Sequence, residues 1–465
     1  MEASKVFTVR SHVLGLLESG QITEGQQIPP ARDLAHELDI SFAKVQHGID
    51  ALCRDGLLEA HPRQGVFVLQ GWRDRVLQDN LSVFDKLHRL PWLPGLLDMI
   101  HEEIPDLRIT KHFSRSILEI KTTLHVLTRH EEYMDLSTAL EDCYPDKSVF
   151  FEKAFDPFRI NGRLVGIPFS FSPRVIYCNP KLFKKATCTL PAHGWTSETF
   201  LETIQTLCKT LPPEQVLNWH GYPFLWMTFV FRAGGRLFDP SKPDPVCIDH
   251  PNTLAGLHYF KAIGKALGKR PDYDDDKCKE SFVNGETAMF IADRLFTNRI
   301  KISGFEDWIT VPLPSIPGGQ DVTAQATDLI CVRNSCSSPL LVRKLVRMIL
   351  SEPVQDRLAQ EKASIPIRRS SAFKSFDLDD TREAILITEM TKVCNDFHLA
   401  SPYPGELVLK GIQRILDDNL DIDKGCKELA SLARTTLGIR NMIPENSPVV
   451  SEFAVPSKRI PPPSV

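Results

Sequence analysis

The side chains of this sequence that could carry out chemistry do not form a catalytic set. An enzyme needs a nucleophile beside a base, a metal cluster or a loop that holds a phosphate, and the sequence has no G-x-S-x-G, H-E-x-x-H, Walker or dinucleotide motif. Its 11 cysteines are scattered singly from Cys53 to Cys426, without a CxxC pair or a Cys/His cluster at zinc spacing. We therefore expect no enzymatic activity, no cofactor and no bound metal.

Side chains able to read DNA gather near the N-terminus. Val45, Ile49 and Leu52 recur at helical spacing and predict a helix with one buried face. The side chains left to face outward on its first turns are Phe42, Ala43, Lys44, Gln46 and His47. The first turns of a recognition helix are the part that enters the major groove of DNA.

Two further helices and a hairpin would position that helix. Apolar residues from Val6 to Leu17 recur at helical spacing, a second helical run follows from Arg32 to Leu38, and Ser41 stands where it can cap the third helix. Gly56 to Ala60 and Gly65 to Val68 then predict two short strands, and the tip between them carries Arg63. Three helices and a hairpin make up a winged helix-turn-helix.

Four segments of this region resemble the GntR family of transcription regulators in residue type, order and spacing: Ile28 to Ala35, Ile40-Ser41, Asp55 to Glu59, and Arg63 to Val68. The DNA-contacting positions that the resemblance implies are Arg32, Ser41, Phe42, Ala43, Lys44, Gln46, Arg63 and Gly65. Arg32 and Arg63 would hold phosphates, and Gln46 would read adenine. Ala43 would touch a thymine methyl group.

The charge of this region departs from what DNA binding requires. The family usually places arginines on the recognition helix where this chain has Phe42 and Gln46. Residues 1–70 hold six basic and nine acidic side chains, a net charge of −3 in a chain whose total is −4. Because affinity for DNA grows with the number of neutralised phosphates, we expect a homodimer that doubles the basic positions. An alternative stays open, in which the winged helix mediates protein contacts only.

From Asn80 onward, strand and helix signals alternate, which is typical of α/β organisation. Pro91 to Ile104 is amphipathic, Leu107 to Thr110 is strand-like, and Ile117 to Leu127 predicts another helix. Beyond residue 370 three helices are expected, over Thr381 to Asp396, Pro404 to Asp418 and Lys424 to Leu437.

Between residues 133 and 370 the sequence resembles the family-one solute-binding proteins of sugar ABC transporters. The matching segments are Tyr133 to Glu141, Asn161 to Phe183, Gly194 to Phe200, Phe282 to Ile291, Trp308 to Pro314 and Ile365 to Arg369. The resemblance implies an α/β, periplasmic-binding-protein-like fold of type II. Its two lobes would be joined by strands that cross near Phe171 to Tyr177 and Thr310 to Leu313, with the ligand held between the lobes. Closure around a ligand would supply two states.

Sugar recognition needs flat aromatic faces and a few hydrogen-bonding side chains. The candidates on the loops and at the expected crossings are Ser170, Ser172, Arg174, Trp226, Asp293, Arg294 and Asp328, accompanied by Phe224 and Thr327. Arg294 follows an apolar strand, where a charge seldom serves stability alone. It also stands near a position that is often tryptophan in sugar binders, so a different or more acidic ligand stays open.

The sequence thus predicts an α/β protein with four parts: a winged helix-turn-helix at 1–70, a linker at 71–79, a two-lobed effector domain at 80–440 and a disordered tail at 441–465. Met1 to Arg10 has no apolar run for export, and the longest apolar stretch, Phe224 to Phe231, is too short for a membrane helix. We expect a cytoplasmic, dimeric transcription regulator that binds a double-stranded DNA operator and a small effector, most simply a sugar, without a membrane partner. The rival prediction is a cytoplasmic solute-binding or scaffold protein.

Overall fold

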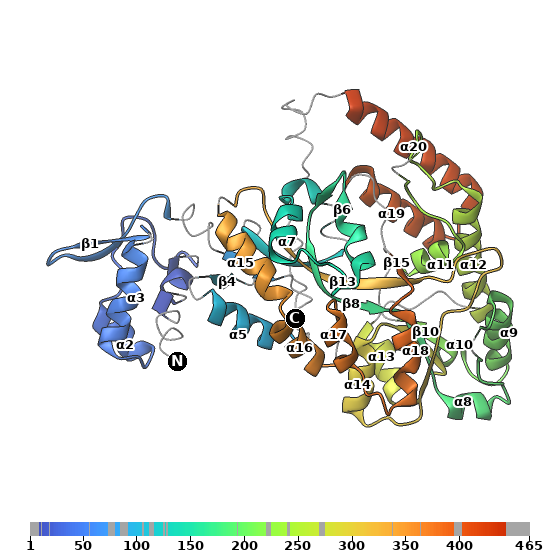
Figure 1. Ribbon diagram of the computed structural model, residues 1–465. Helices are drawn as coiled ribbons and strands as arrows, with labels where there is room; N and C mark the ends of the chain where they lie inside the picture. The colour runs from blue at the N-terminus through green and yellow to red at the C-terminus, as the bar shows by residue number, and fades with distance from the viewer. Residues whose placement is uncertain are drawn as a thin grey trace.

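The chain folds around two separate hydrophobic cores, one from Val9 to Trp72 and one from Leu81 to Ala433. Figure 1 shows the computed structural model, in which the first core forms a small domain beside a large two-lobed one. The structure describes residues 9–10, 12–17, 19–54, 56–72, 80–83, 92–104, 107–110, 116–123, 126, 129–192, 194–219, 225–239, 242–268, 275–336, 338–362, 364–394 and 402–442. Of the expected linker at 71–79 only residues 71–72 are described, and of the expected tail at 441–465 only residues 441–442, which belong to the last helix.

The small domain has the predicted three helices and hairpin. Residues 9–10 and 12–17 are helical, followed by α2 (Ala31–Glu37), α3 (Phe42–Arg54), β1 (Leu58–His61) and β2 (Gly65–Val68). Residues 25–28, just before α2, add a third strand-like edge to the hairpin. The Gly25 amide donates to the Val68 carbonyl and the Ile28 amide to the Val66 carbonyl, both at 2.9 Å. This edge fixes the hairpin against the helices, so the winged helix-turn-helix prediction is confirmed.

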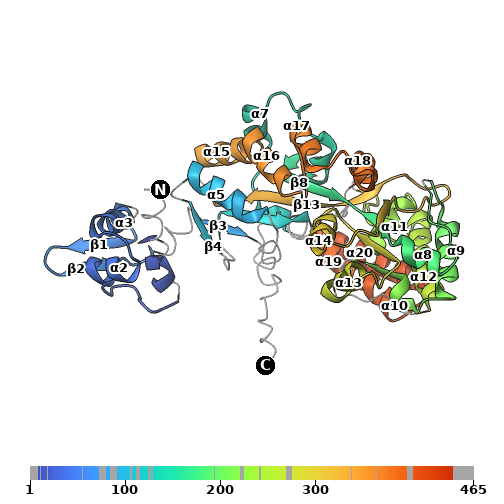
Figure 2. The ribbon, with the colours of Figure 1, turned by 90° about the horizontal axis from the view of Figure 1, so that it is seen from below.

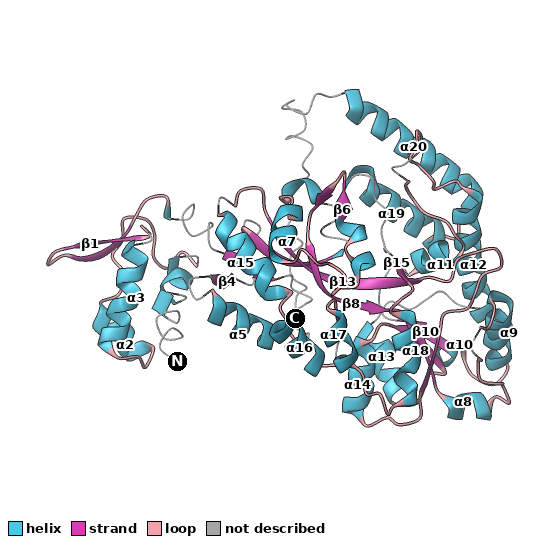
Figure 3. Ribbon diagram, viewed as in Figure 1, coloured by secondary structure: helices cyan, strands magenta, loops and turns pink. Residues whose placement is uncertain are grey.

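The first lobe of the large domain is built on a mixed sheet with the strand order β14-β8-β13-β5-β3-β4, and β15 lies beside β13. These strands are β3 (Asn80–Val83), β4 (Arg108–Thr110), β5 (Leu118–Thr122), β8 (Ile167–Pro173), β13 (Thr323–Val332), β14 (Ile365–Pro366) and β15 (Val393–Cys394). The helices packed around it include α5 (Leu93–Glu103), α7 (Ser137–Cys143), α15 (Pro339–Ile349), α16 (Glu352–Gln360) and α17 (Arg369–Ala372). Figure 3 shows the strands of this sheet enclosed by helices.

The second lobe has its own sheet, with the strand order β10-β11-β9-β12. These strands are β9 (Val175–Cys178), β10 (Leu217–Trp219), β11 (Met289–Ala292) and β12 (Ile309–Val311). Its helices include α8 (Pro180–Lys185), α9 (Ser197–Cys208), α10 (Pro213–Val216), α11 (Trp226–Arg232), α12 (Pro251–Leu267), α13 (Asp275–Val283), α14 (Leu295–Ser303) and α18 (Ala384–Glu389). The two-lobed α/β prediction is therefore confirmed.

The chain crosses between the lobes where the sequence predicts it. β8 belongs to the first sheet and β9 to the second, with only Arg174 between them. The second crossing follows β12 and leads into β13. A third connection, not predicted, runs from β14 through the turn η6 (Phe373–Ser375) to α18, which packs on β9 and β12.

Two local predictions are wrong. Ile117 to Leu127 is predicted to be helical, but Leu118–Thr122 form β5, an inner strand paired with β3 and β13, and of that range only Thr123 and Val126 are helical among the described residues. Leu118 to Lys121 alternate apolar and polar side chains, but Glu119 is buried like Leu118 and Ile120 because it pairs with Arg333, so the polar positions do not mark a solvent-facing side of the strand. The helix expected over Thr381 to Asp396 ends at Glu389, because the next residues turn back to pair Val393 and Cys394 with β13.

A C-terminal helical hairpin covers the second lobe, as the sequence predicts. It consists of α19 (Pro402–Asp417) and α20 (Ile422–Met442). Arg434 of α20 binds Asp249 through two nitrogens, at 2.9 and 3.0 Å, and Asp244 at 2.7 Å. These contacts attach the hairpin to the segment that precedes α12.

None of the helices in the described part of the chain has the length and apolar character that a membrane-spanning helix needs.

Candidate functional site

The recognition helix α3 presents the side chains that the sequence places in a major groove. Its inner face buries Val45, Gly48, Ile49 and Leu52. On the opposite side the exposed positions are Ser41, Phe42, Ala43 and His47, and the half-buried ones are Lys44 and Gln46. Arg32, on the first turn of α2, is also exposed. The residues that the sequence predicts to face the groove are therefore all exposed or half-buried.

The wing carries Arg63 at its exposed tip, in the left-handed backbone region at φ 64°. Gly65 follows at φ 112°, and a Cβ atom there would stand 2.0 Å from Nε2 of Gln27. The rings of His61 and Phe67 meet edge to face at 5.2 Å across the hairpin, which stiffens the hairpin near its tip. Gly65 thus shapes the wing through its backbone, and Arg63 is the side chain that the wing offers to a partner.

One predicted base-reading residue is already engaged within the helix. The Gln46 Nε2 donates to the Asp50 carboxylate one turn later, at 2.9 Å. The contact fixes the direction of the Gln46 amide and places a carboxylate on the outer side of α3, where Asp50 is exposed. Because a carboxylate repels phosphates, α3 offers little electrostatic attraction to DNA.

At the first crossing, β8 and β13 bring Ser170 and Asp328 together. The Ser170 hydroxyl donates to the Asp328 carboxylate at 2.9 Å. Burial raises the pKa of Asp328 to about 7, and the nearby Asp293 carboxylate adds to the rise, while the Ser170 hydrogen bond opposes it. Its side chain still keeps some solvent contact. Asp328 is therefore a sheltered carboxyl able to gain or lose a proton near neutral pH.

Ser172, two residues along β8, ties this strand to the loop after β11. Its hydroxyl accepts the backbone N–H of Arg294 at 2.7 Å. Asp293, the residue before, caps the start of α14 by accepting the Leu295 amide at 3.0 Å. Ser170, Ser172, Asp293 and Asp328 thus form one polar group at the junction of the lobes.

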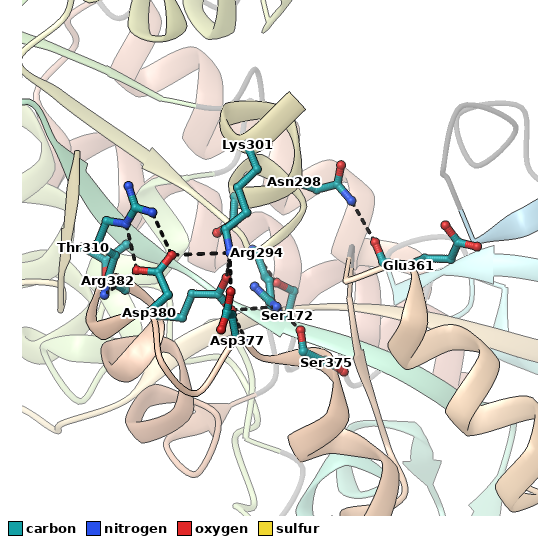
Figure 4. A network of polar contacts seen from close by, with 12 residues as sticks. Ser172, Arg294, Asn298, Lys301, Thr310, Glu361, Ser375, Asp377, Asp380 and Arg382 are labelled. Carbon is teal, nitrogen blue, oxygen red and sulfur yellow. Dashed lines mark hydrogen bonds and ion pairs between the residues drawn. The ribbon is translucent and has the colours of Figure 1, made fainter. Parts of the chain in front are cut away.

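The Arg294 side chain turns away from that group and into the protein. It is fully buried and pairs with the equally buried Glu383, with 2.9 Å between Nη2 and Oε2. The same Nη2 donates to the Ser375 carbonyl, and the guanidinium lies 4.5 Å from the Phe376 ring centre. Figure 4 shows Arg294 beside Ser375 in this network. The contacts of Arg294 connect α14 with the third connection between the lobes.

Further charges surround this pair. Lys301 of α14 contacts Glu383 and lies 3.4 Å from Asp380, and Asp380 binds Arg382 at 2.7 Å (Figure 4). Burial lowers the pKa of Arg294 and the Glu383 carboxylate opposes that effect. The Nε and Nη1 atoms of Arg294 have no hydrogen-bond partner among the described residues. The charge of Arg294 is nevertheless balanced inside the protein, because its Nη2 pairs with the Glu383 carboxylate.

The two remaining predicted ligand residues meet α11. Arg174 is buried between the sheets, and its Nη1 donates to the Thr228 hydroxyl at 3.4 Å. Trp226 starts α11, is fully buried, and donates from its indole nitrogen to Gln413 of α19 at 3.0 Å. Trp226 therefore joins α11 to the C-terminal hairpin. Phe224 lies outside the described residues.

Three residues that organise these contacts were not predicted: Glu383, Gln413 and Arg232. Arg232 is buried on α11 and donates to the carbonyls of Leu313 at 3.0 Å and Pro314 at 2.8 Å, on the second crossing. Glu383 and Gln413 lie in segments that the sequence marks only as helical. Of the three residues, only Arg232 had a signal in the sequence: it is an arginine that ends an apolar helical run.

Among the described residues, no group of three His, Cys, Asp or Glu side chains could hold a metal.

Two protein families match this chain. Residues 8–68 match the bacterial regulatory proteins of the gntR family, and residues 126–380 match the bacterial extracellular solute-binding proteins. The second match covers more than half of the chain. No curated protein is similar enough in sequence to count as a relative.

Solved structures with the same fold are solute-binding proteins. Maltose-bound MalE3 of T. maritima is 17% identical with a TM-score of 0.61, and the match covers 77% of this chain and 99% of that protein. A tagatose-bound ABC transporter protein of Thermotoga lettingae is 14% identical with a TM-score of 0.64 and the same coverage. UgpB of Mycobacterium tuberculosis, in complex with glycerophosphocholine, is 13% identical with a TM-score of 0.64, covering 78% and 99%. At these identities the likeness shows the fold.

Proposed function

This chain belongs to the bacterial extracellular solute-binding protein family and carries a gntR-family regulatory domain at its N-terminus, and from that premise we propose that it is an effector-responsive transcription regulator. Its winged helix binds a DNA operator, and its two-lobed domain binds a small carbohydrate-like solute. The observation that carries the proposal is the union, in one chain, of an outward-facing recognition helix with a polar group at the junction of two lobes.

The position of the polar group supports ligand binding. Ser170 and Asp328 stand on the crossing strands, where both lobes can reach a bound molecule, and Asp328 keeps some contact with solvent. Similar folds hold maltose, tagatose and glycerophosphocholine in the solved structures, and each of these ligands carries at least two hydroxyl groups. A hydroxyl-rich solute is the ligand class that carboxylates and serines recognise best.

The charge of this group decides between acidic and neutral ligands. Arg294, the cation that favoured an acidic ligand, is paired with Glu383. Asp293 and Asp328 form no ion pair with a basic side chain in the described residues, and no basic group lowers the pKa of Asp328. The site therefore favours a neutral sugar or one that bears an amine over an acidic sugar.

Two measurements on the full-length protein test the proposal. The first follows thermal unfolding in the presence of neutral, amino and acidic mono- and disaccharides, and stabilisation by a neutral or amino sugar is expected. The second selects bound duplexes from a randomised DNA pool at about 50 mM salt, where phosphate contacts are strong. Stabilisation by acidic sugars alone would refute the charge argument, and enrichment of no duplex at all would refute DNA binding.

We propose further that the protein acts in the cytoplasm as a homodimer. A single winged helix of net charge −3 offers only Arg32, Lys44 and Arg63 near DNA, and a symmetric pair doubles these contacts on two half-sites. The same acidity supports a second candidate, a solute-sensing scaffold whose winged helix binds another protein. Sedimentation with and without the selected duplex separates the two, because a scaffold would not bind the DNA.

A further inference from the structure

The recognition helix presents an aromatic ring to solvent at its first turn. Phe42 is the first residue of α3, and 51% of its surface is exposed. Ala43, the next residue, is exposed as well. An aromatic ring gains free energy when it leaves water, so an exposed ring at a contact surface favours an apolar partner.

Two of the neighbouring side chains are less free to make polar contacts to bases. Gln46 is hydrogen-bonded to Asp50 at 2.9 Å, Lys44 is half-buried, and Asp50 places a negative charge on the same outer side. Beside the exposed Ser41 and His47, the first turns of α3 therefore present an apolar surface made by Phe42 and Ala43. Discrimination between bases at this surface should accordingly depend more on apolar contact than on charge.

We propose that Phe42 is the specificity-determining residue of α3 and reads thymine C5-methyl groups in the major groove. Thymine is the one base of unmodified DNA that presents a methyl group there, and phenylalanine and alanine are suited to contact it. Ala43 extends the same apolar surface along the helix. The operator half-site accordingly contains A·T pairs where the first turn of α3 docks. This inference rests on the proposed DNA-binding function.

The expected effect can be set from the size of a methyl group. Burial of one such group corresponds to a factor of about four in affinity. If each subunit of a dimer buries one thymine methyl, removing both weakens binding about 15-fold. Replacing thymine by uracil removes only the methyl group and leaves base pairing unchanged, so it isolates this contact.

The experiment uses duplexes selected from a randomised pool by the full-length protein. Each thymine of the enriched half-site is replaced in turn by uracil, and binding is measured by fluorescence anisotropy for the native protein and for Phe42→Ala. The native protein should lose about fourfold per sensitive methyl, and Phe42→Ala should bind thymine and uracil duplexes equally. Phe42→Leu keeps an apolar side chain and should retain part of the discrimination.

Two controls match these changes. Ile302→Ala removes an apolar side chain that is 80% exposed on α14, far along the chain from the winged helix, and should leave discrimination intact. Uracil outside the half-sites should have no effect. Equal affinity of the native protein for thymine and uracil at every half-site position would overturn the role of Phe42. So would discrimination that persists in Phe42→Ala. Failure to select any duplex would instead contradict the proposed DNA-binding function.

Discussion

Replacing Arg294 with methionine should destabilise the two-lobed domain whether or not a ligand is present. Methionine has a similar length but no charge, so it fills much of the same space and leaves Glu383 without its buried arginine partner. Both side chains are buried, with exposed fractions of 0% and 1%, and their charged atoms are 2.9 Å apart. Removal of one member of a buried pair usually costs about 3–5 kcal/mol, because it leaves an uncompensated charge inside the protein.

The lower end of that range applies here. Lys301 also contacts Glu383 and compensates part of its charge after the substitution. A loss of about 3 kcal/mol in a domain larger than 250 residues lowers the Tm by about 6 °C, since each kcal/mol corresponds to about 2 °C at this size. The assay is thermal unfolding followed by circular dichroism, for Arg294→Met, Glu383→Gln and the double variant. The double variant should lose less than the sum of the single losses.

Arg343→Met is the matched control for this substitution. Arg343 pairs with Asp142 at 3.1 Å on the surface, where the two side chains are 48% and 45% exposed. A pair of this kind contributes about 0–1 kcal/mol, so the Tm should hardly change. If Arg294→Met unfolds at the native Tm but no longer binds its solute, Arg294 acts in ligand recognition and the structural role argued for it is wrong.

Three further predictions concern the wing and the crossing. Arg63→Gln should weaken binding to the selected duplex and reduce the slope of log K against log salt by about 0.9 per subunit, and an unchanged slope would contradict a phosphate contact. Asp328→Asn should raise the Tm relative to the native protein at pH 8 and leave it nearly equal at pH 4. A carboxyl whose pKa is raised to about 7 on folding costs stability as pH rises from about 4 to 7, so a Tm difference independent of pH would refute the shift. Gly65→Ala should destabilise the winged helix by about 1–3 kcal/mol in chemical unfolding, because its φ of 112° and the nearby Gln27 both oppose a Cβ atom. Gly71→Ala, where φ is 72° and a Cβ would meet no atom within 4 Å, should cost less.

The winged helix could be predicted almost residue by residue because its signals are local. The apolar spacing of Val45, Ile49 and Leu52 sets the inner face of α3, and the hairpin follows within a dozen residues. Similar local signals identified α19 and α20. The strand β5 was missed for the opposite reason, since its identity depends on pairing with β13, about 200 residues later.

The predicted ligand residues show the same limit. Ser170 and Asp328 do meet at the crossing, because their positions on β8 and β13 pair directly, and Ser172 on the same strand bonds the Arg294 amide. The position of Arg294 after an apolar strand could be recognised in the sequence, but its partner could not, because Glu383 is 89 residues away in a segment with no distinguishing pattern. A charge after an apolar strand can therefore serve stability alone, contrary to the reasoning from sequence. The ligand roles of all seven residues stay predictions.

The contacts of α11 bear on how an effector could influence the DNA-binding domain. Thr228 accepts from Arg174 at the first crossing, and Arg232 holds the Leu313 and Pro314 carbonyls at the second. Trp226, at the start of the same helix, binds Gln413 in the C-terminal hairpin. Since α11 is bound to both crossings and to the hairpin, the second lobe should move as one body when the crossings bend.

The winged helix is joined to the other lobe. The chain leaves it at Trp72 and next forms β3 and α5 of the first lobe, and Figure 2 shows the winged helix next to that lobe with the second lobe at the far end. A solute held at the Ser170–Asp328 pair would lie between the body that moves and the body that carries the DNA-binding domain. If the protein is the proposed dimeric regulator, the solute would change operator affinity through the angle between the lobes, because that angle can change without an internal change in either lobe. A disulfide that fixes the two lobes together should accordingly abolish the response to solute while preserving DNA binding.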